Sequence, residues 1–540
     1  MPLNLASPGI VVREVDLTVG RVDPTTGSIA AQVAPFAKGP VDVPTVVETE
    51  ADLLSIFGEP YSTDKHYEHW LVASSYLAYG GNMRIVRADD DDLLNAGISD
   101  VGVALTNTKI KSKEHYEQLG YDTNVISGVT FAARNPGSWA NGLKVAIIDA
   151  KADQILSGVS TTGLGESVTV GMGVTQAISA TLPGNGTTTT LDGYLKGVVT
   201  QVSGTDVYVK VLSHVSSGST ETAVDYQASG VYQFTSSGSL GFHTAGQSAS
   251  FGTTSYTSTL DWFDQQTIST VGSSTLSWNT LADRPGTSEY AAARNSRFDE
   301  IHVVVIDATG EVSGNAGTIL EKHLNLSKAK DAEYSVGSTA YWRKYLANVS
   351  LNVFGGTAPA GITTTGFSSG FTLQSDQGWD QNADGIIFGA AGSNTYTLGG
   401  GKNYDGTTDI TASGALTSTL GKLSTGYGLF ENTENYEIDY VLMGSANYTK
   451  ETAQALANKC ISVAELRQDS VACISPYRGA FISDGTVGSV TVNSDATITD
   501  NVLSFYAPVT SSTYGILDSC LLYTSPSPRD RTRSRMPSSA

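Results

Sequence analysis

The order of helix-like and strand-like segments constrains this chain most, because similar α/β patterns stand near both ends. Near the start, residues 29–36 and 45–47 read as strands, and residues 83–88 read as another strand after two helical segments. Near the end, an amphipathic helix with apolar residues over 453–464 precedes an apolar strand at 471–474. We expect these segments to complete one α/β domain around a long insertion.

Local signals place the first two helices of this domain. Thr49 to Asp52 resembles a capping box, so a helix is expected to begin there and to end at Gly58. The next helix is predicted to bury the face that carries apolar residues at i, i+3, i+4 and i+7 spacing. That face contains Tyr67, Trp70, Leu71, Ser74, Leu77 and Ala78.

The middle of the chain reads as β structure. Residues 151–280 are rich in Ser, Thr and Gly, and stretches such as 207–211 alternate apolar and polar residues, which favours antiparallel strands with one solvated face. Residues 143–148 form a good strand, 301–306 is an almost unbroken apolar run typical of a central strand, and 351–430 is Gly/Thr-rich. The predicted fold class is multidomain α+β: an α/β inner core with long β-rich insertions.

These patterns predict a division of the chain into seven parts. They are an extended arm (1–20), the first part of the inner core domain (21–88), a loop-rich connection or small insertion (89–128), an outer β-rich insertion (129–350), a β-rich intermediate region (351–430), the second part of the core (431–519) and a basic tail (520–540). The tail is Pro/Ser-rich and acid-poor in an acidic chain. It reads either as a disordered basic tail or, as we expect, as a non-native end.

Charge and cysteine content exclude several classes of protein. The chain has 32 Lys and Arg against 53 Asp and Glu, a net charge of −21, so nucleic-acid binding and docking on an anionic membrane are disfavoured. No long apolar run predicts a membrane span, no secretory signal is visible, and synthesis and folding in a cytoplasm are expected. The three cysteines form no C-x-x-C pair, so neither a zinc site nor a disulfide framework is predicted.

A short apolar stretch near the N-terminus has two interpretations. It consists of Gly9, Ile10, Val11, Val12, Arg13, Glu14 and Val15, and no partner strand lies beside it in sequence. It is either an edge strand of its own domain or an arm donated to a neighbouring subunit by β-augmentation.

Four patterns resemble sites of chemistry, and each is better explained structurally. Residues 366–370 fit G-x-S-x-G but lack the helix that a nucleophile elbow needs, so a Gly/Ser loop is expected. Residues 399–403 lack the first Walker glycine and its Ser or Thr, so a turn is expected. Residues 380–385 match half a calcium loop, but Ala391 stands where the bidentate Glu belongs, which favours an Asx-rich turn over weak structural calcium.

The fourth pattern is a histidine pair, His66 and His69, at i, i+3 spacing on a predicted helix. No third ligand follows at a diagnostic spacing, so we expect both residues to be isolated surface histidines and predict no metal site. Cys460 and Cys473 look like small core residues. The sequence therefore predicts no catalytic residue, no cofactor and no enzyme activity.

A series of short motifs runs in order along the chain. The early motifs are Ser7 to Ile10 with Arg13 and Glu14, then 36–40, 51–54, 57–60, 79–82, 85–88 and 134–145; the later ones are 284–288, 299–303 and 466–469 before Ser475 and Pro476. Together they resemble the tail sheath proteins of contractile-tailed, myovirus-type bacteriophages. Residues 134–145 are the most specific piece, and 151–280 match least.

The resemblance marks a set of structural residues and implies no catalytic ones. They are Gly39, Pro40, Phe57, Gly58, Pro136, Gly137, Trp139, Asn141, Gly142, Arg467, Asp469 and Pro476. The family's C-terminal part should continue well beyond Asp518, so the expected core elements and C-terminal arm look absent from about Cys520 onward.

The resemblance also implies a mechanical function without a cofactor. Such subunits form hexameric rings stacked helically around a tail tube, contact baseplate and tail terminator proteins, and contract to drive the tube through the host envelope. The implied location is the virion tail, assembled in the host cytoplasm, with no direct nucleic-acid contact and no membrane insertion. A sheath from a non-phage contractile injection system and a β-rich surface binding protein are the alternatives.

Overall fold

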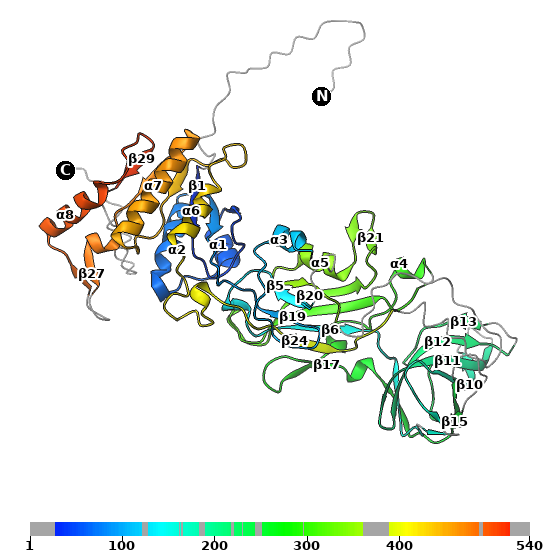
Figure 1. Cartoon of the computed structure of the whole chain (residues 1–540). Coiled ribbons are helices and arrows are strands. Elements are labelled where there is room, and N and C mark those ends of the chain that lie inside the picture. Colours follow the sequence, from blue (N-terminus) through cyan, green and yellow to red (C-terminus); the bar gives the residue numbers. More distant parts are fainter. Residues whose placement is uncertain are drawn as a thin grey trace, which may run out of the picture. The chain divides into compact units, whose positions relative to one another are not determined.

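The computed structural model shows a mixed α+β protein whose described residues form two compact units (Figure 1). The described residues are 28–120, 128–160, 162–163, 166–182, 189–217, 221–228, 230–243, 251–294, 296–359, 388–484 and 490–518. Unit 1 takes its described residues from 28–36, 42–89 and 418–518, and unit 2 takes them from 37–41 and 90–417.

Unit 1 is built on a six-stranded sheet that contains segments from both ends of the chain. Its order is β2 (Thr45–Val47), β3 (Asn82–Arg87), β1 (Ile29–Ala34), β25 (Tyr440–Leu442), β26 (Val471–Ile474) and β29 (Gly515–Leu517). Every neighbouring pair is parallel except β2 with β3. A parallel sheet is normally covered on both faces, which explains why its strands are apolar on both sides.

Helices cover both faces of this sheet, and alternate residues of β1 show the division. Ala30 and Ala34 pack in the cluster with α1 (Glu50–Phe57) and α2 (Tyr67–Ala78). Ala31 and Val33 pack in the cluster with α6 (Leu420–Gly428), α7 (Lys450–Arg467) and α8 (Asp495–Tyr506). The period of two along the strand therefore divides the core into two layers.

The predicted capping box of α1 is confirmed. The Thr49 hydroxyl accepts a hydrogen bond from the amide of Asp52, and the Asp52 carboxylate accepts one from the amide of Thr49, each at 3.1 Å. Gly58 ends the helix with a φ of 86°, which a residue with a side chain rarely adopts.

The predicted buried face of α2 is partly wrong. Trp70 and Leu77 are buried as expected, but Leu71 and Ala78 are exposed, and the remaining buried positions are His69 and Ala73. The buried face of the helix, which carries His69, Trp70, Ala73 and Leu77, is therefore rotated from the predicted one. The apolar character of Leu71 did not decide which face is buried.

Unit 2 contains a four-stranded antiparallel sheet at its centre. Its order is β20 (Thr318–Ser327), β19 (Glu300–Asp307), β6 (Leu143–Asp149) and β24 (Asn394–Thr397). Val303 and Val305 pack on one face, and Val304 and Ile306 pack on the other. This burial on both faces confirms the prediction of a central strand at 301–306.

A second, larger sheet in unit 2 contains eight antiparallel strands, and we call residues 154–261 the β insertion. Its strands are β7 (Gln154–Ser157), β10 (Gly173–Leu182), β11 (Thr189–Ser203), β12 (Asp206–Val215), β13 (Glu221–Ala223), β14 (Leu240–His243), β15 (Phe251–Thr253) and β16 (Ser258–Asp261). The alternating stretch 207–211 lies in β12, which is antiparallel to β11 and β7. The antiparallel pairing predicted there is confirmed.

Smaller elements complete the described chain. One is a three-stranded sheet of β4 (Gly97–Ile98), β5 (Phe131–Ala133) and β23 (Val353–Gly355). Three short helices are α3 (Lys113–Gln118), α4 (Glu289–Ala292) and α5 (Trp342–Val349). Four pairs of strands are β8 (Thr162–Gly163) with β9 (Glu166–Ser167), β17 (Thr267–Ser269) with β18 (Thr275–Ser277), β21 (Glu333–Ser335) with β22 (Ser338–Thr339), and β27 (Ile482–Asp484) with β28 (Val490–Val492).

Helix α6 corrects the prediction that 351–430 is β-rich throughout. Its sequence contains Gly421, Gly426 and Gly428, and glycine has a low helix propensity, so the sequence pattern concealed it. Gly426 is needed for packing, because a Cβ there would lie 2.6 Å from Cγ1 of Val33 in β1. The helix can approach the sheet closely only without a side chain at this position.

This close approach predicts opposite effects for two glycines of the same helix. Gly426→Ala should lower the free energy of unfolding of unit 1 by roughly 1–3 kcal/mol, since the added methyl group overpacks the contact with β1. Gly421→Ala is the matched control, because a Cβ there meets nothing within 4 Å. It should leave stability unchanged or raise it by up to about 1 kcal/mol. Calorimetric unfolding measures both; equal effects would contradict the packing argument.

Candidate functional site

The structure places the sequence-predicted structural residues in two separate groups. Gly39, Pro40 and the residues of 136–142 lie in unit 2, whereas Phe57, Gly58, Arg467, Asp469 and Pro476 lie in unit 1. The predicted arm, Gly9 to Val15, lies outside the described residues. The possible nucleophile elbow at 366–370, the possible calcium loop at 380–385 and the tail at 520–540 also lie outside them.

In unit 2, three of the predicted segments meet, and we call 37–41, 136–142 and 399–403 together the clasp. The Asn141 side chain donates to the carbonyl oxygen of Gly401 at 2.9 Å and accepts from its amide at 2.8 Å. Asn403 makes the equivalent contacts in the opposite direction: its Oδ1 accepts from the amide of Ser138 at 2.9 Å, and its Nδ2 donates to the Ser138 hydroxyl at 2.8 Å. Two asparagines therefore join the segments reciprocally.

Glycine is required where the clasp segments touch. At Gly137, with a φ of 132°, a Cβ would lie 2.9 Å from the carbonyl oxygen of Ala37. At Gly401 a Cβ would lie 2.4 Å from the carbonyl oxygen of Gly137, and at Gly142, with a φ of 89°, it would lie 2.5 Å from Thr309, which is outside the clasp. The Lys38 ammonium lies 4.7 Å from the centre of the Trp139 ring, and burial lowers the pKa of Lys38 against the opposing effect of Glu321.

The clasp also explains the segment that resembles a phosphate loop. The amides of Gly401, Lys402 and Asn403 donate to Asn141, to the carbonyl oxygen of Leu94 and to that of Thr407, respectively. A phosphate-binding loop needs such amides free to point at the ligand, and it needs a helix after the loop. Here a single 3₁₀ turn, Tyr404–Gly406, follows, so the segment serves as a structural connection.

In unit 1, Arg467 connects the end of α7 to a neighbouring loop. Its guanidinium group forms two hydrogen bonds with Asp469, at 2.9 and 3.0 Å, and donates to the carbonyl oxygens of Phe430 and Tyr436 at 2.7 and 2.9 Å. A cation at a helix C-terminus is also favoured by the helix dipole. The side chain is fully buried and its donors are used within the fold, so Arg467 has a structural role.

The other predicted residues of unit 1 are packed in the core or at turns. Phe57 is fully buried, and its ring centre lies 4.8 Å from that of Phe36. Pro476 is buried after β26.

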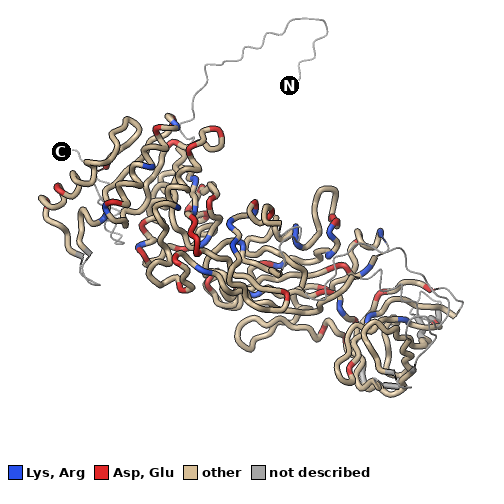
Figure 2. Tube along the Cα trace, viewed as in Figure 1, with Lys and Arg blue, Asp and Glu red and all other residues tan. Residues whose placement is uncertain are grey.

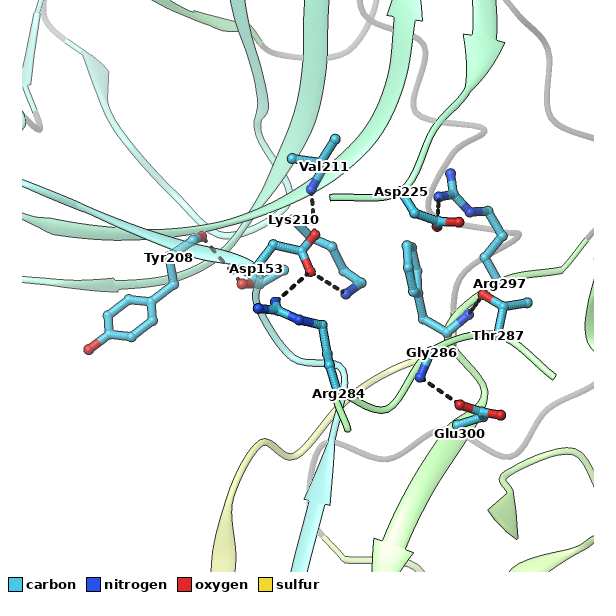
Figure 3. A network of polar contacts seen from close by, with 12 residues as sticks. Asp153, Tyr208, Lys210, Val211, Asp225, Arg284, Gly286, Thr287, Arg297 and Glu300 are labelled. Atoms are coloured by element: carbon cyan, nitrogen blue, oxygen red, sulfur yellow. Dashed lines mark hydrogen bonds and ion pairs between the residues drawn. The ribbon is translucent and has the colours of Figure 1, made fainter. Parts of the chain in front are cut away.

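A further polar network, which sequence reasoning missed, lies beside the β insertion (Figure 3). One terminal nitrogen of Arg284, Nη2, lies 2.6 and 2.5 Å from the two carboxylate oxygens of Asp261, and the other, Nη1, lies 3.4 Å from Asp153. Lys210 lies 3.3 Å from the same Asp153 oxygen. Arg297 donates to the carbonyl oxygens of Leu212 and Val224 and to Asp225 at 2.6 to 2.7 Å.

The only signal for this network in the sequence was indirect. The resemblance included 284–288 and 299–303, and the structure brings these segments together. Glu300 accepts from the amide of Gly286 at 2.7 Å, and Asp299 accepts from the amide and the hydroxyl of Ser288 at 2.8 and 2.7 Å. Sequence spacing could not show which charges of the β insertion would meet Arg284 and Arg297.

The histidine pair does not form a metal site in the arrangement observed, and the expectation of surface histidines is wrong. His66 and His69 are buried at 0% and 5% exposure. Nδ1 of His66 accepts from the amide of Tyr61 at 3.2 Å, and Nδ1 of His69 accepts from the amide of Ser445 at 3.3 Å. Among the described residues, no group of three or more His, Cys, Asp and Glu side chains could hold a metal ion.

Serine, histidine and a carboxylate meet at Glu321, but not in an order that activates a nucleophile. The Glu321 carboxylate lies between the other two, accepting from Ser350 at 2.6 Å and contacting His323 at 2.9 Å. A hydrolytic triad needs the histidine next to the serine, so that it can take the hydroxyl proton. The Ser350 oxygen also accepts from the amides of Asn352 and Val353, which makes it part of a turn.

Cys460 is buried, as expected for a core residue, and Cys473 is partly buried. Burial raises the pKa of the Cys460 thiol to about 12 and also raises that of Cys473, so both thiols stay protonated near neutral pH. None of the helices in the described part of the chain combines the length and apolar character that crossing a bilayer requires.

Comparison with known proteins gives matches to phage tail sheath proteins. The chain is 36% identical over 90 residues to the tail sheath protein of Enterobacteria phage T4, which covers 17% of this chain and 13% of the phage protein. It is 39% identical over 90 residues to the tail sheath protein of Vibrio phage KVP40, covering 16% of this chain and 13% of that protein. This chain is similar to phage tail sheath proteins. The resemblance inferred from the motifs is confirmed over that stretch.

The similarity is confined to a small share of each relative. The matched stretch spans 13% of the length of both phage proteins, and no family model matches the chain. A solved structure, the sheath tail protein Lin1278 from Listeria innocua, aligns with 90% of this chain and 57% of that chain. Its identity is 9% and its TM-score 0.24, a value too low to establish a shared fold.

The hydrogen bonds of the clasp predict that a substitution of the buried Asn403 lowers the stability of unit 2. Asn403→Asp keeps an acceptor for the Ser138 amide, and the Ser138 hydroxyl can turn to donate to the new carboxylate, so the cost of the substitution is that of placing a negative charge in a buried position. The free energy of unfolding of unit 2 should fall by roughly 1–3 kcal/mol. Asn107→Asp, at an exposed position of the same unit, is the matched control and should be neutral within about 0.5 kcal/mol. Denaturant unfolding compares the two, and equal shifts would refute the role of the clasp.

The buried histidines predict acid sensitivity of unit 1. Burial, the main cause, lowers the pKa of His66 to about 4 and that of His69 to about 3. Between these values and the unfolded pKa near 6.5, the unfolded state binds more protons, so stability falls as the pH drops through that window, by roughly 3 kcal/mol for His66 alone.

Histidine C2-hydrogen exchange, followed by mass spectrometry between pH 3 and 9, measures these pKa values. The midpoints for His66 and His69 should lie below pH 5, and a histidine-containing peptide in the same samples gives the reference for an unfolded chain. A midpoint near 6.5 for either residue would show that it is not held neutral by the fold.

Proposed function

We propose that this chain is a structural subunit of a contractile tail sheath. The observation that carries the proposal is the 36–39% identity with two phage tail sheath proteins. In this proposal the subunits polymerise around a tail tube as stacked hexameric rings, and the sheath contracts to drive the tube through the host envelope. The partners are further copies of the chain, a tail tube protein, and baseplate and tail terminator proteins of a virion tail assembled in the host cytoplasm.

The architecture of unit 1 supports a sheath subunit in which early and late segments of the sequence share one hydrophobic core. Ala30 of β1 pairs with Tyr440 of β25, although more than 400 positions of sequence separate them. We infer that unit 1 is the inner core domain and that the β-rich part of unit 2 is inserted into it. Such a core keeps both ends of the chain in one domain, from which terminal arms can reach neighbouring subunits.

The use of polar groups within the described residues supports a structural function. Buried cations and carboxylates bind one another or the backbone, as at Arg467, Glu321 and the network around Arg284. Figure 2 shows acidic and basic positions interspersed along the described chain, with long stretches of neither. A structural subunit needs such satisfied buried groups and no strained reactive one.

The N-terminal residues Gly9 to Val15 are proposed to form the arm that connects subunits. In the described residues β29 is an outer strand of the six-stranded sheet and pairs with β26. An outer strand presents backbone donors and acceptors along its free side, and an apolar extended segment of another copy can add there as a further strand.

Electron microscopy of three purified chains tests the proposal. The chain in which residues 520–540 are replaced by the C-terminal region that the resemblance leads us to expect should form rings or tubes when the tail tube protein is supplied. Deletion of residues 7–15 from that chain should abolish stacking because it removes the arm, and the chain as it stands is the third sample. Monomers of both undeleted chains with the tube protein present would contradict the sheath function. Tubes that survive the 7–15 deletion would contradict only the arm.

A further inference from the structure

The β insertion is attached to the rest of unit 2 through two short connections that lie side by side. One connection, residues 150–153, leads from β6 into β7, and the other follows the end of β16 at Asp261. The two strands that leave and return are paired, with Ile155 opposite Leu260. Two adjacent connections fix one point of attachment, but by themselves they leave the β insertion free to rotate about that point relative to the rest of unit 2.

The apolar contact at this attachment is small. A separate cluster contains only four buried residues: Ala150, Val198, Leu212 and Phe298. Ile155 and Tyr208 add partly buried surface against the cluster below the four-stranded sheet. Interfaces of this size and polarity normally permit relative motion of the two parts.

Charged side chains from the segment 284–298 cross this attachment (Figure 3). The Arg284 guanidinium contacts carboxylates on both connections, Asp153 before β7 and Asp261 at the end of β16. Its planar group also lies over two rings, 4.7 Å from the centre of Tyr226 and 5.7 Å from that of Phe263. One side chain therefore holds the outgoing and the returning connection at the same time.

Arg297 holds the β insertion at a second place. It donates to the carbonyl oxygen of Leu212 in β12 and to that of Val224 just after β13, and it pairs with Asp225. Its side chain is 12% exposed, and its guanidinium also lies 4.6 Å from the Phe298 ring centre. Two separated anchor points on one segment oppose rotation, which a single point cannot do.

The cost of burying its charges indicates that the network around Arg284 and Arg297 fixes the orientation of the β insertion more than it adds to the free energy of unfolding. Lys210 is 3% exposed, and burial, which outweighs the opposing effect of Asp153, lowers its pKa to about 8. A cation whose pKa is lowered by burial costs free energy in the charged form, so Lys210 adds less stability than its contact with Asp153 alone would give. Buried ionic groups of this kind are known to select one arrangement over others, and the forked guanidinium adds directional bonds.

We propose that Arg284 and Arg297 form an ionic clamp that fixes the orientation of the β insertion relative to the four-stranded sheet. With the clamp closed, the two sheets of unit 2 move as one body. When the clamp is opened, each sheet keeps its fold, but the insertion rocks about its paired connections. This inference does not depend on the proposed function. In a sheath subunit, the clamp would keep the insertion in a constant position during contraction.

Distance measurements between two spin labels test the clamp in the full-length chain. The labels are attached to cysteines at Thr205, exposed at the β11–β12 turn of the insertion, and at Glu117, exposed on α3, after Cys460 is replaced by Ala and Cys473 and Cys520 by Ser. Pulsed electron–electron double resonance should give a narrow distribution of label-to-label distances for the otherwise unchanged chain. The variant Arg284→Ala/Arg297→Ala should at least double its width.

Matched variants separate the clamp from a general effect of losing charge. Arg294→Ala removes a cation of the same segment that stacks on Tyr290, outside the network, and should leave the distribution unchanged. Arg284→Lys keeps the charge but loses the forked geometry, so an intermediate width is expected.

Amide hydrogen exchange on the same variants shows whether the sheets stay folded. Strands β10 to β12 should keep their protection in the double variant, because Arg284 and Arg297 belong to none of the strands of that sheet and its ladder hydrogen bonds do not depend on them. An unchanged distance distribution in the double variant would overturn the proposal. Loss of protection throughout the insertion would overturn it too, since the arginines would then be needed for folding and not for orientation.

Discussion

The parallel pairing of β1 with β25 is the contact on which unit 1 depends. It joins the segments that contain α1 and α2 to those that contain α6, α7 and α8, and each side alone would leave the edge of a small parallel sheet unpaired. Parallel sheets are stable when helices cover both faces, and only the combined sheet has both apolar layers. Because the partners are far apart in sequence, closing this contact carries a loop-closure cost, and the intervening unit 2 must be compatible with it.

Unit 2 uses a different principle, in which buried polar side chains fix connections between strands. Asp149 at the end of β6 accepts from the amides of Ala391 and Gly392 and from Lys328, and the clasp joins 136–142 to 399–403 through two asparagines. Each such bond contributes little net free energy, but leaving a buried partner unsatisfied is costly. These groups therefore restrict the number of alternative packings, which suits a subunit that must present the same surface in every copy.

The sequence predicted elements whose pattern depends on local signals and missed those that depend on distant contacts. The capping box at Thr49, the strand at 301–306 and the helix over 453–464 have local causes, and the structure confirms them. Helix α6 was missed because its glycines lower the helix propensity, and Gly426 is explained only by the approach of Val33, far away in the sequence. The burial of His69 likewise depends on a distant residue, Ser445. The network around Arg284 was likewise invisible, since it joins charges from four separate stretches.

The same distinction applies to the candidate site. Patterns such as G-G-G-K-N at 399–403 suggest chemistry when only neighbours in sequence are considered, but the amides of Gly401 and Lys402 donate to Asn141 and Leu94, far away in the sequence. A motif becomes a site only when its donors and acceptors remain free for a ligand. In the described residues the motifs of this chain meet one another instead: 37–41 meets 136–142, 136–142 meets 399–403, and 284–288 meets 299–303. Where these segments meet, their polar groups bind one another, so within the described residues they maintain the shape of the chain and present no site for a ligand.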